Sequence, residues 1–236
     1  MRVATARLLP RAKGTLCAFL SAGDHAMKRL LVVLLACVLV QSAQAQTVKL
    51  VTERTADHPA LILLKGQMKI PSSALRTFIA VSALQNEQTI VLLNSPGGAI
   101  GTAIEIGKII KQRGFKTAVP DFERCLSACA LIWLAGKERL VGGSASIGFH
   151  STRPALTSFE TSYRGNAAVE GYLAYALNRP ELTAYVTKAS PRSMTWLTIA
   201  DAKELKLEVT QFSLSNPQWA WAREALERPQ LLKVAR

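Results

Sequence analysis

The chain has few of the side chains that most often bind structural metals: three His and four Cys among 236 residues. After the first 45 residues only two of each remain: His58, His150, Cys125 and Cys129. Two cysteines cannot complete a four-ligand zinc cage, and His58 stands beside Pro59 in a polar segment rather than near a second ligand. We therefore expect no metal and no other cofactor.

Aromatic and charged residues are also scarce, at 6% and 19%, whereas 49% of the residues are hydrophobic. This composition excludes a disordered chain and predicts a buried core. The net charge is +13, but six of the 29 basic residues fall in the first 45 positions and the others are spread singly. A nucleic-acid surface needs a basic stripe interleaved with aromatic side chains, so we expect no nucleic-acid partner.

The first 45 residues have the organisation of a leader. Met27-Lys-Arg29 precedes the apolar run Leu30–Val40, and a small-residue cleavage site ends at Ala45. These three parts describe a secretory signal peptide over Met27–Ala45, with Met27 as the expected start. The run is too short to span a bilayer comfortably. A lipoprotein signal and a retained N-terminal membrane anchor are the alternatives.

Cleavage after Ala45 leaves a mature chain, Gln46–Arg236, outside the inner membrane, which we expect to be in the periplasm. In such an oxidising compartment an even pair of cysteines suggests a disulfide between Cys125 and Cys129. Residues four apart in a regular helix approach closely enough only with distortion. Two free thiols that pack as small hydrophobes are therefore the alternative.

The mature chain alternates short apolar runs with amphipathic stretches. Strands are expected at 60–66, 89–94, 116–119, 139–141, 145–149 and, at an edge, 208–212; helices at 71–84, 99–113, 127–135, 158–189, 199–205 and 217–226. Almost wholly apolar strands predict a mostly parallel sheet covered by helices on both faces. No repeat or linker interrupts the pattern, so residues 46–236 are expected to form one α/β domain with a C-terminal helix.

The segment Asn94-Ser-Pro-Gly-Gly98 lies where an expected strand turns into an expected helix. Two adjacent glycines allow positive φ and bring backbone N–H groups close to a ligand. The following helix adds the positive end of its dipole. Such a turn suits an oxyanion, although the steric demands of a tight turn explain the same glycines.

Two further segments carry candidate chemistry. Ser127 lies between Cys125 and Cys129 at the start of an apolar helix, where the commonest role of a serine is to cap the helix. His150 ends an expected strand, at the sheet edge where open α/β folds bind ligands. A lone histidine there is more often structural than catalytic. Each residue alone leaves a structural and a functional interpretation open.

Together, the order and spacing of these segments resemble the Clp protease proteolytic subunit and its relatives in the ClpP/crotonase superfold. The family's strand, Asn-Ser-Pro-Gly-Gly turn and helix match residues 89–113, and its nucleophile elbow matches Ser127–Gly136. Its strand before the base histidine matches Ser146–His150, and its closing helix resembles Leu197–Leu207. The resemblance covers about residues 60–207 and implies repeated strand–helix units around a mostly parallel sheet.

The resemblance implies a serine peptidase, an endopeptidase or related hydrolase. Ser127 would be the nucleophile and His150 the general base. The oxyanion hole would be formed by the backbone N–H of Ala128 and of a glycine in the pair Gly97-Gly98, with Gly98 favoured. Peptides or unfolded proteins would be the substrates and a homo-oligomer the assembly. Because no ATP is supplied outside the inner membrane, we expect no ATPase partner.

One position departs from the family's pattern. The third catalytic member, an Asp just before the closing helix, would fall near Met194, where the sequence has no acid. Asp201 matches a position inside that helix. Losing the group that orients the imidazole can cost about 10⁴ in rate. Ser193, a backbone carbonyl or water would have to replace it.

Three alternatives follow from the same residues. The missing acid favours a catalytically inactive binding or scaffold protein that kept the elbow for structural reasons. Related signal peptide peptidases pair the serine with a lysine, for which Lys137 and Lys188 are candidates, although His150 favours the Clp-like pairing. A crotonase-type acyl-CoA enzyme would use the same oxyanion geometry, but the expected export separates it from CoA.

Overall fold

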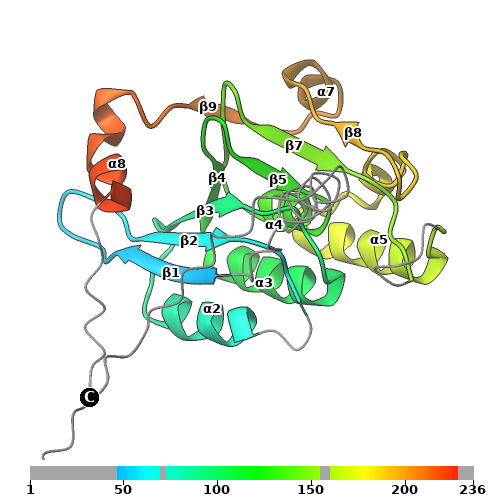
Figure 1. Cartoon of the computed structure of the whole chain (residues 1–236), viewed down its shortest axis with the longest axis horizontal. Coiled ribbons are helices and arrows are strands. Elements are labelled where there is room, and N and C mark those ends of the chain that lie inside the picture. The colour runs from blue at the N-terminus through cyan, green and yellow to red at the C-terminus, as the bar shows by residue number, and fades with distance from the viewer. Residues whose placement is uncertain (1–46, 70–72, 155–159, 228–236) are drawn as a thin grey trace, which may run out of the picture. The chain divides into compact units, whose positions relative to one another are not determined.

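A computed structural model describes residues 47–69, 73–154 and 160–227, and most expected elements are present (Figure 1). Elements within two residues of the expected bounds are β2 (Leu61–Lys65), β3 (Ile90–Asn94), β4 (Lys116–Val119), β6 (Arg139–Gly142), β7 (Ser146–Phe149), α2 (Ser73–Ala83), α3 (Ile100–Arg113), α4 (Ala128–Leu134) and α7 (Ile199–Glu204). The expected signal peptide, Met27–Ala45, lies outside the described residues. Within the described ranges no helix combines the length and apolar character needed to cross a membrane.

Six strands form the main sheet in the order β1-β2-β3-β4-β6-β9. β1 (Thr47–Thr52) pairs antiparallel with β2, and all other neighbours pair parallel, including β9 (Thr210–Phe212) beside β6. The expected fold class, a mostly parallel sheet flanked by helices, is confirmed. The sequence does not predict β1, because this partly buried strand has no continuous apolar run.

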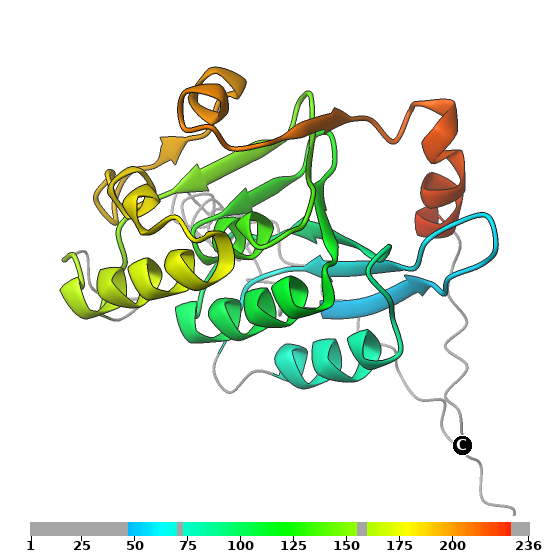
Figure 2. The same cartoon turned by 180° about the vertical axis from the view of Figure 1, so that it is seen from behind.

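Alternate residues of the central strands face two different apolar layers. Ile62 and Val91 belong to the larger core cluster, which α2, α3 and α4 cover, whereas Leu61 and Leu92 belong to a smaller cluster beneath α8 (Ala220–Glu227). Figures 1 and 2 show α2 and α3 on one side of the sheet and α8 on the other. Burial of both faces explains why these strands are continuous apolar runs.

A second, three-stranded sheet carries the elements that lead into the site. β5 (Arg124–Leu126) pairs parallel with β7, which pairs antiparallel with β8 (Thr195–Trp196). Ser95 joins the two sheets: its N–H donates to the Arg124 carbonyl at 2.8 Å, and its carbonyl accepts from the Leu126 N–H at 3.0 Å. β5 and β8 are three and two residues long, too short to leave a periodic signal in the sequence.

The single helix expected over 158–189 is wrong. α5 (Tyr163–Leu177) ends at Asn178, which has a left-handed φ of +55°, and a 3₁₀ turn (Pro180–Leu182) and the short α6 (Thr183–Val186) follow. Asparagine tolerates the left-handed C-cap conformation, and proline has no N–H to continue a helix. The expected C-terminal helix is present as α8, but it is preceded by a 3₁₀ turn at Pro217–Trp219.

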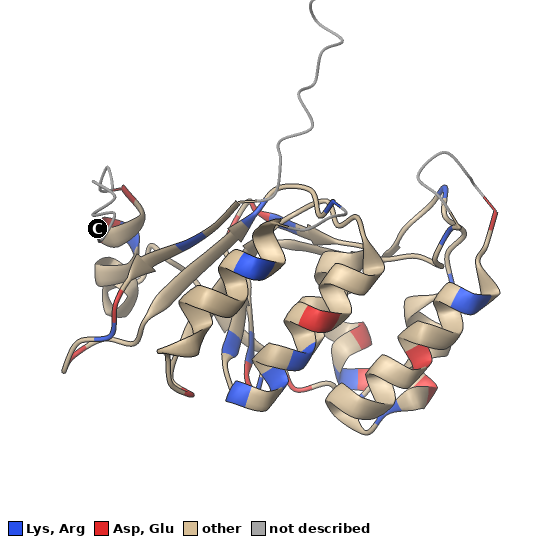
Figure 3. Ribbon diagram, turned by 90° about the horizontal axis from the view of Figure 1, so that it is seen from below, with Lys and Arg blue, Asp and Glu red and all other residues tan. Residues whose placement is uncertain are grey.

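The charges on the helices are mixed in sign. Figure 3 shows basic and acidic residues together on α3 and on α5, whereas α2 carries one charged residue, Arg76. On α3, Lys108 and Glu105 form an ion pair of 2.9 Å one turn apart. These helices therefore present ordinary solvated faces rather than a basic stripe.

Two glycines of α3 provide a matched test of how α3 packs against α5. A Cβ at Gly107 would meet the hydroxyl oxygen of buried Tyr172 at 1.9 Å, whereas a Cβ at Gly101 would have no neighbour within 4 Å. The Tyr172 hydroxyl donates to the Leu131 carbonyl at 2.9 Å, a hydrogen bond that the added methyl would displace.

We expect Gly107→Ala to lower the free energy of unfolding by about 1–3 kcal/mol through overpacking. Gly101→Ala should raise it by about 0.4–1 kcal/mol, because alanine reduces the entropy of the unfolded chain. Urea denaturation of the mature chain measures both changes. A stabilising Gly107→Ala would contradict the described packing.

Candidate active site

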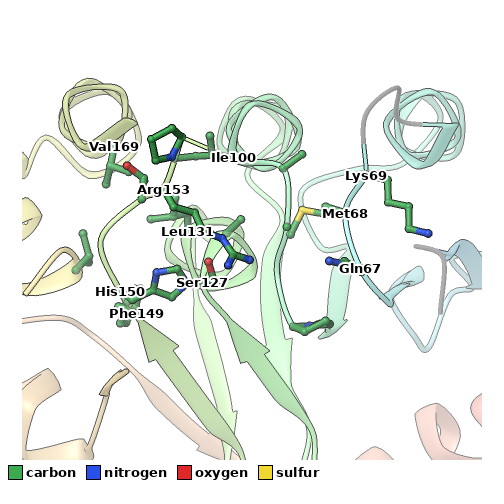
Figure 4. A pocket seen from close by; sticks show the side chains of 17 residues that line it. Gln67, Met68, Lys69, Ile100, Ser127, Leu131, Phe149, His150, Arg153 and Val169 are labelled. Atoms are coloured by element: carbon green, nitrogen blue, oxygen red, sulfur yellow. The ribbon is translucent and has the colours of Figure 1, made fainter. Parts of the chain in front are cut away.

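A pocket of about 550 Å³ lies beside the carboxyl ends of β5 and β7 (Figure 4). Four of the residues predicted to form the site line it: Gly98, Ser127, Ala128 and His150. Ser127 and His150 are both half-buried, so each is accessible from the pocket. Side chains that are far apart in the sequence are thus brought to one cavity, as the sequence analysis expected.

Ser127 and His150 share this pocket because the strands that precede them are neighbours. β5 runs parallel to β7 with Leu126 in register with Gly148. The Ser127 N–H then donates to the Gly148 carbonyl at 2.8 Å, which extends the pairing by one residue. Both chains leave the sheet at its carboxyl edge, where open α/β folds bind ligands.

Ser127 occupies a sharp turn between β5 and α4. Its φ of +55° and ψ of −124° lie outside the regions that residues with a Cβ readily adopt. A strained strand-to-helix turn of this kind exposes the nucleophilic serine of α/β-hydrolases. The Ser127 side chain makes no capping hydrogen bond to α4, so the N-cap interpretation of this serine is wrong.

The expected disulfide between Cys125 and Cys129 is present, and both residues are fully buried. It links β5 to the first turn of α4, with 5.1 Å between the two Cα atoms. Ser127 is the middle residue of the segment that the bridge closes. The covalent link therefore restrains the backbone on both sides of the strained serine.

The two glycines of the Asn94–Gly98 turn have different roles. The Gly97 N–H donates to the Ser95 hydroxyl at 3.0 Å, so it is already used within the turn. Gly98 forms a parallel bridge with Met68, in which Met68 donates to the Gly97 carbonyl and accepts from the Ala99 N–H. In this pattern the N–H of Gly98 itself points away from Met68.

The glycine turn lies directly against the serine elbow. A Cβ at Gly97 would be 2.8 Å from the Ser127 Cβ and 3.0 Å from the Ala128 nitrogen. A Cβ at Gly98, where φ is +133°, would be 2.1 Å from the Met68 carbonyl oxygen. The Ala128 N–H belongs to the first turn of α4 and has no acceptor within the helix. The backbone of Gly98 and Ala128 therefore borders the pocket beside Ser127.

The ring of His150 has a fixed orientation, although the sequence has no acid near Met194 to hold it. Its Nδ1 lies 2.6 Å from the carbonyl oxygen of Ser151. A carbonyl only accepts hydrogen bonds, so Nδ1 carries the proton and Nε2 of the neutral ring keeps a lone pair. Ser151 is buried, and its N–H donates to the Ala189 carbonyl at 2.8 Å. A backbone carbonyl, one of the expected substitutes for the missing acid, thus bonds Nδ1.

The other candidates for orienting or replacing His150 lie elsewhere. Ser193 is exposed and hydrogen-bonds within its own turn. Asp201 caps α7 by bonding Thr198, and these hydrogen bonds lower the pKa of its carboxyl. Lys137 and Lys188 are exposed, and neither is among the residues that line the pocket. In the described part of the chain, no cluster of three His, Cys, Asp or Glu residues could hold a metal.

The wall of the pocket contains residues that the sequence analysis did not single out. Ile100, Leu131 and Val169 each contribute an apolar side chain from α3, α4 and α5, respectively. Among the described residues that line the pocket, the charged ones are Lys69 and Arg153, both basic. A basic residue three positions after the histidine is the one sequence signal that could have identified Arg153.

No protein-family profile and no curated protein matches the chain. Among solved structures it is similar to a mutant of the 1510-N membrane-bound stomatin-specific protease (18% identity, TM-score 0.47), covering 63% of this chain and 76% of that one. It is also similar to ClpP1 from Listeria monocytogenes (18% identity, TM-score 0.49), covering 64% of this chain and 91% of that one. A third similar structure is the ClpP protease catalytic domain from Plasmodium falciparum (17% identity, TM-score 0.48), covering 66% of this chain and 88% of that one. The resemblance is one of fold.

Removal of the disulfide is expected to loosen the elbow without unfolding the chain. A bridge that closes so short a loop restrains the unfolded chain little, so the Cys125→Ala/Cys129→Ala variant should lose only about 2 kcal/mol of stability. Relief of backbone strain of about 1–3 kcal/mol should displace Ser127 and slow its reaction with a fluorophosphonate about 10-fold or more. Adding a reductant should slow the labelling of Ser127 in the wild-type protein to the same extent and leave labelling of the variant unchanged. Equal labelling rates in the wild-type protein and the variant would contradict the role of the disulfide in holding the elbow.

The neutral imidazole of His150 is expected to be protonated on Nδ1. The reason is the carbonyl of Ser151, which can bind only a protonated nitrogen. Nitrogen-15 chemical shifts of the ring, assigned with a His150→Asn variant and distinguished from those of His58, measure the tautomer directly. Protonation on Nε2 would contradict the orienting role of the carbonyl.

Proposed function

We propose that the protein is a serine peptidase of the ClpP type that acts on short or unfolded peptides. The observation that carries the proposal is the state of the Ser127 hydroxyl, which is held on a strained turn, makes no capping bond and borders the same pocket as His150. A purely structural serine at the start of a helix would relax into the capping conformation.

In this reaction the Ser127 Oγ attacks the carbonyl carbon of the scissile peptide while Nε2 of His150 accepts the hydroxyl proton. The C–N bond then breaks, and His150 returns the proton to the leaving amine. Water, deprotonated by the same Nε2, attacks the acyl carbon; the ester C–O bond to Ser127 breaks, and His150 returns the proton to the Ser127 Oγ. Nδ1 stays bound to the Ser151 carbonyl throughout, which holds the ring orientation and leaves Nε2 to exchange the proton.

The N–H groups of Gly98 and Ala128 are proposed to form the oxyanion hole. Both border the pocket next to Ser127, and the Gly97 N–H is already engaged by Ser95. One such donor typically lowers the barrier by about 3 kcal/mol. The proposal therefore assigns the glycine turn a catalytic role as important as that of the general base.

The proposal includes export to the periplasm as the mature chain Gln46–Arg236. A disulfide next to the nucleophile is compatible with an oxidising compartment and is rare in the cytosol. We also propose a homo-oligomer, as the sequence resemblance implies, whose size light scattering of the mature protein would measure.

Labelling with a fluorophosphonate tests the nucleophile. The mature protein should form one adduct on Ser127, which Ser127→Ala abolishes. His150→Gln should slow labelling by about 10²–10⁴, the usual contribution of a general base. Ser193→Ala, at an exposed serine outside the pocket, is the matched control and should label at the wild-type rate.

Circular dichroism would show whether each variant is folded, and mass spectrometry would locate the adduct. A folded protein without a Ser127-dependent adduct would contradict the peptidase proposal. That result would instead support the inactive binding or scaffold protein that the missing acid near Met194 favours.

A further inference from the structure

The pocket contains a guanidinium that the proposed chemistry does not use. Arg153 follows His150 by three residues and lines the same pocket as Ser127. Figure 4 shows its side chain pointing into the pocket, on the side where Ser127 and His150 lie. Of the three ion pairs between described residues, none includes Arg153.

The described lining of the pocket offers this guanidinium no counterion. Among the described residues that line it there is no Asp or Glu. The second cation, Lys69, is exposed, and in Figure 4 its side chain extends away from the centre. Arg153 is half-buried, so an anion that joins it in the pocket is screened less by solvent than a surface pair. The charge of the pocket therefore favours a negatively charged ligand.

The backbone just before Arg153 is anchored to the start of α5. The Thr152 N–H donates to the Asn166 side chain on α5 at 2.9 Å, and the Thr152 hydroxyl donates to the Ser162 carbonyl at 2.9 Å. A Cβ at Gly165 would meet the Thr152 hydroxyl at 2.1 Å, so this close approach requires the glycine. Arg153 thus extends from an anchored position rather than from a free loop.

We propose that Arg153 binds a carboxylate of the peptide substrate and so determines which peptides the site accepts. The planar guanidinium donates two parallel hydrogen bonds to a carboxylate, a geometry that lysine does not provide. The carboxylate is either the C-terminus of the peptide or an acidic side chain. An apolar side chain of the same peptide occupies the wall formed by Ile100, Leu131 and Val169. This assignment rests on the proposed peptidase function.

Binding measured without turnover tests the assignment. The protein is the mature chain with Ser127→Ala, and the probe is an Ala-Ala-Leu-Gln-Ala-Ala peptide with an N-terminal zwitterionic rhodamine. Three forms are compared: a neutral C-terminal carboxamide, a free C-terminal carboxylate, and the carboxamide with Glu in place of Gln. Fluorescence anisotropy gives the Kd of each.

At least one anionic peptide should bind about 10- to 100-fold more tightly than the neutral one, as expected for hydrogen bonds between charged groups. Arg153→Gln should abolish this preference, and Arg153→Lys should restore only part of it. Arg164→Gln removes an exposed arginine outside the pocket and should leave the preference unchanged. Tighter binding of the peptide with the free C-terminal carboxylate identifies the C-terminus as the bound group, and tighter binding of the Glu peptide identifies an acidic side chain.

The proposal is overturned if the preference is absent, if it survives Arg153→Gln, or if neither anionic peptide binds up to about 1 mM. Fluorophosphonate labelling of the wild-type protein separates this result from a failure of the peptidase proposal. Labelling of Ser127 without an Arg153-dependent preference rejects only the role of Arg153. An Arg153-dependent preference without labelling keeps the carboxylate site and rejects the peptidase.

Discussion

The parallel pairing of β5 with β7 determines where the reactive groups lie. The hydrogen bond from the Ser127 N–H to the Gly148 carbonyl, at 2.8 Å, continues this pairing past the end of β5. It places the serine opposite Phe149, the residue before His150 on the neighbouring strand. Because Ser95 bonds to β5 from the other side, the glycine turn is brought to the same edge. One short sheet therefore positions the proposed nucleophile, base and oxyanion donors together.

The positive φ of Ser127 persists because several restraints act on it at once. A residue in such a conformation costs about 1–3 kcal/mol, which a flexible turn would release. Here the Gly148 carbonyl holds its N–H, the Cys125–Cys129 bridge spans it, and Gly97 packs against its Cβ. The strain keeps the hydroxyl out of the capping position and in the pocket. The local geometry thus depends on tertiary contacts, not on the propensity of the sequence.

Elements with strong local signals could be predicted from the sequence. The helix expected over 99–113 matches α3 and ends at a left-handed Gly114, and the buried strands follow their apolar runs. β5 and β8 could not be predicted, since so few residues carry no periodicity. The carbonyl of Ser151 has no sequence signature at all, because every residue has one. The role of Gly97 within the turn depended on a hydrogen bond to Ser95 that spacing alone does not reveal.

A carbonyl in place of a carboxylate changes the electrostatics of the proposed reaction. Both orient the imidazole, but a neutral carbonyl stabilises the imidazolium that forms when Ser127 loses its proton less than a carboxylate does. The positive charge of Arg153 in the same pocket further disfavours formation of that imidazolium. A substrate carboxylate bound to Arg153 would neutralise the guanidinium and remove this opposition as the reaction begins. On the proposed function, substrate charge would then act on the chemical step as well as on binding, and a neutral peptide would be a poor substrate even when bound.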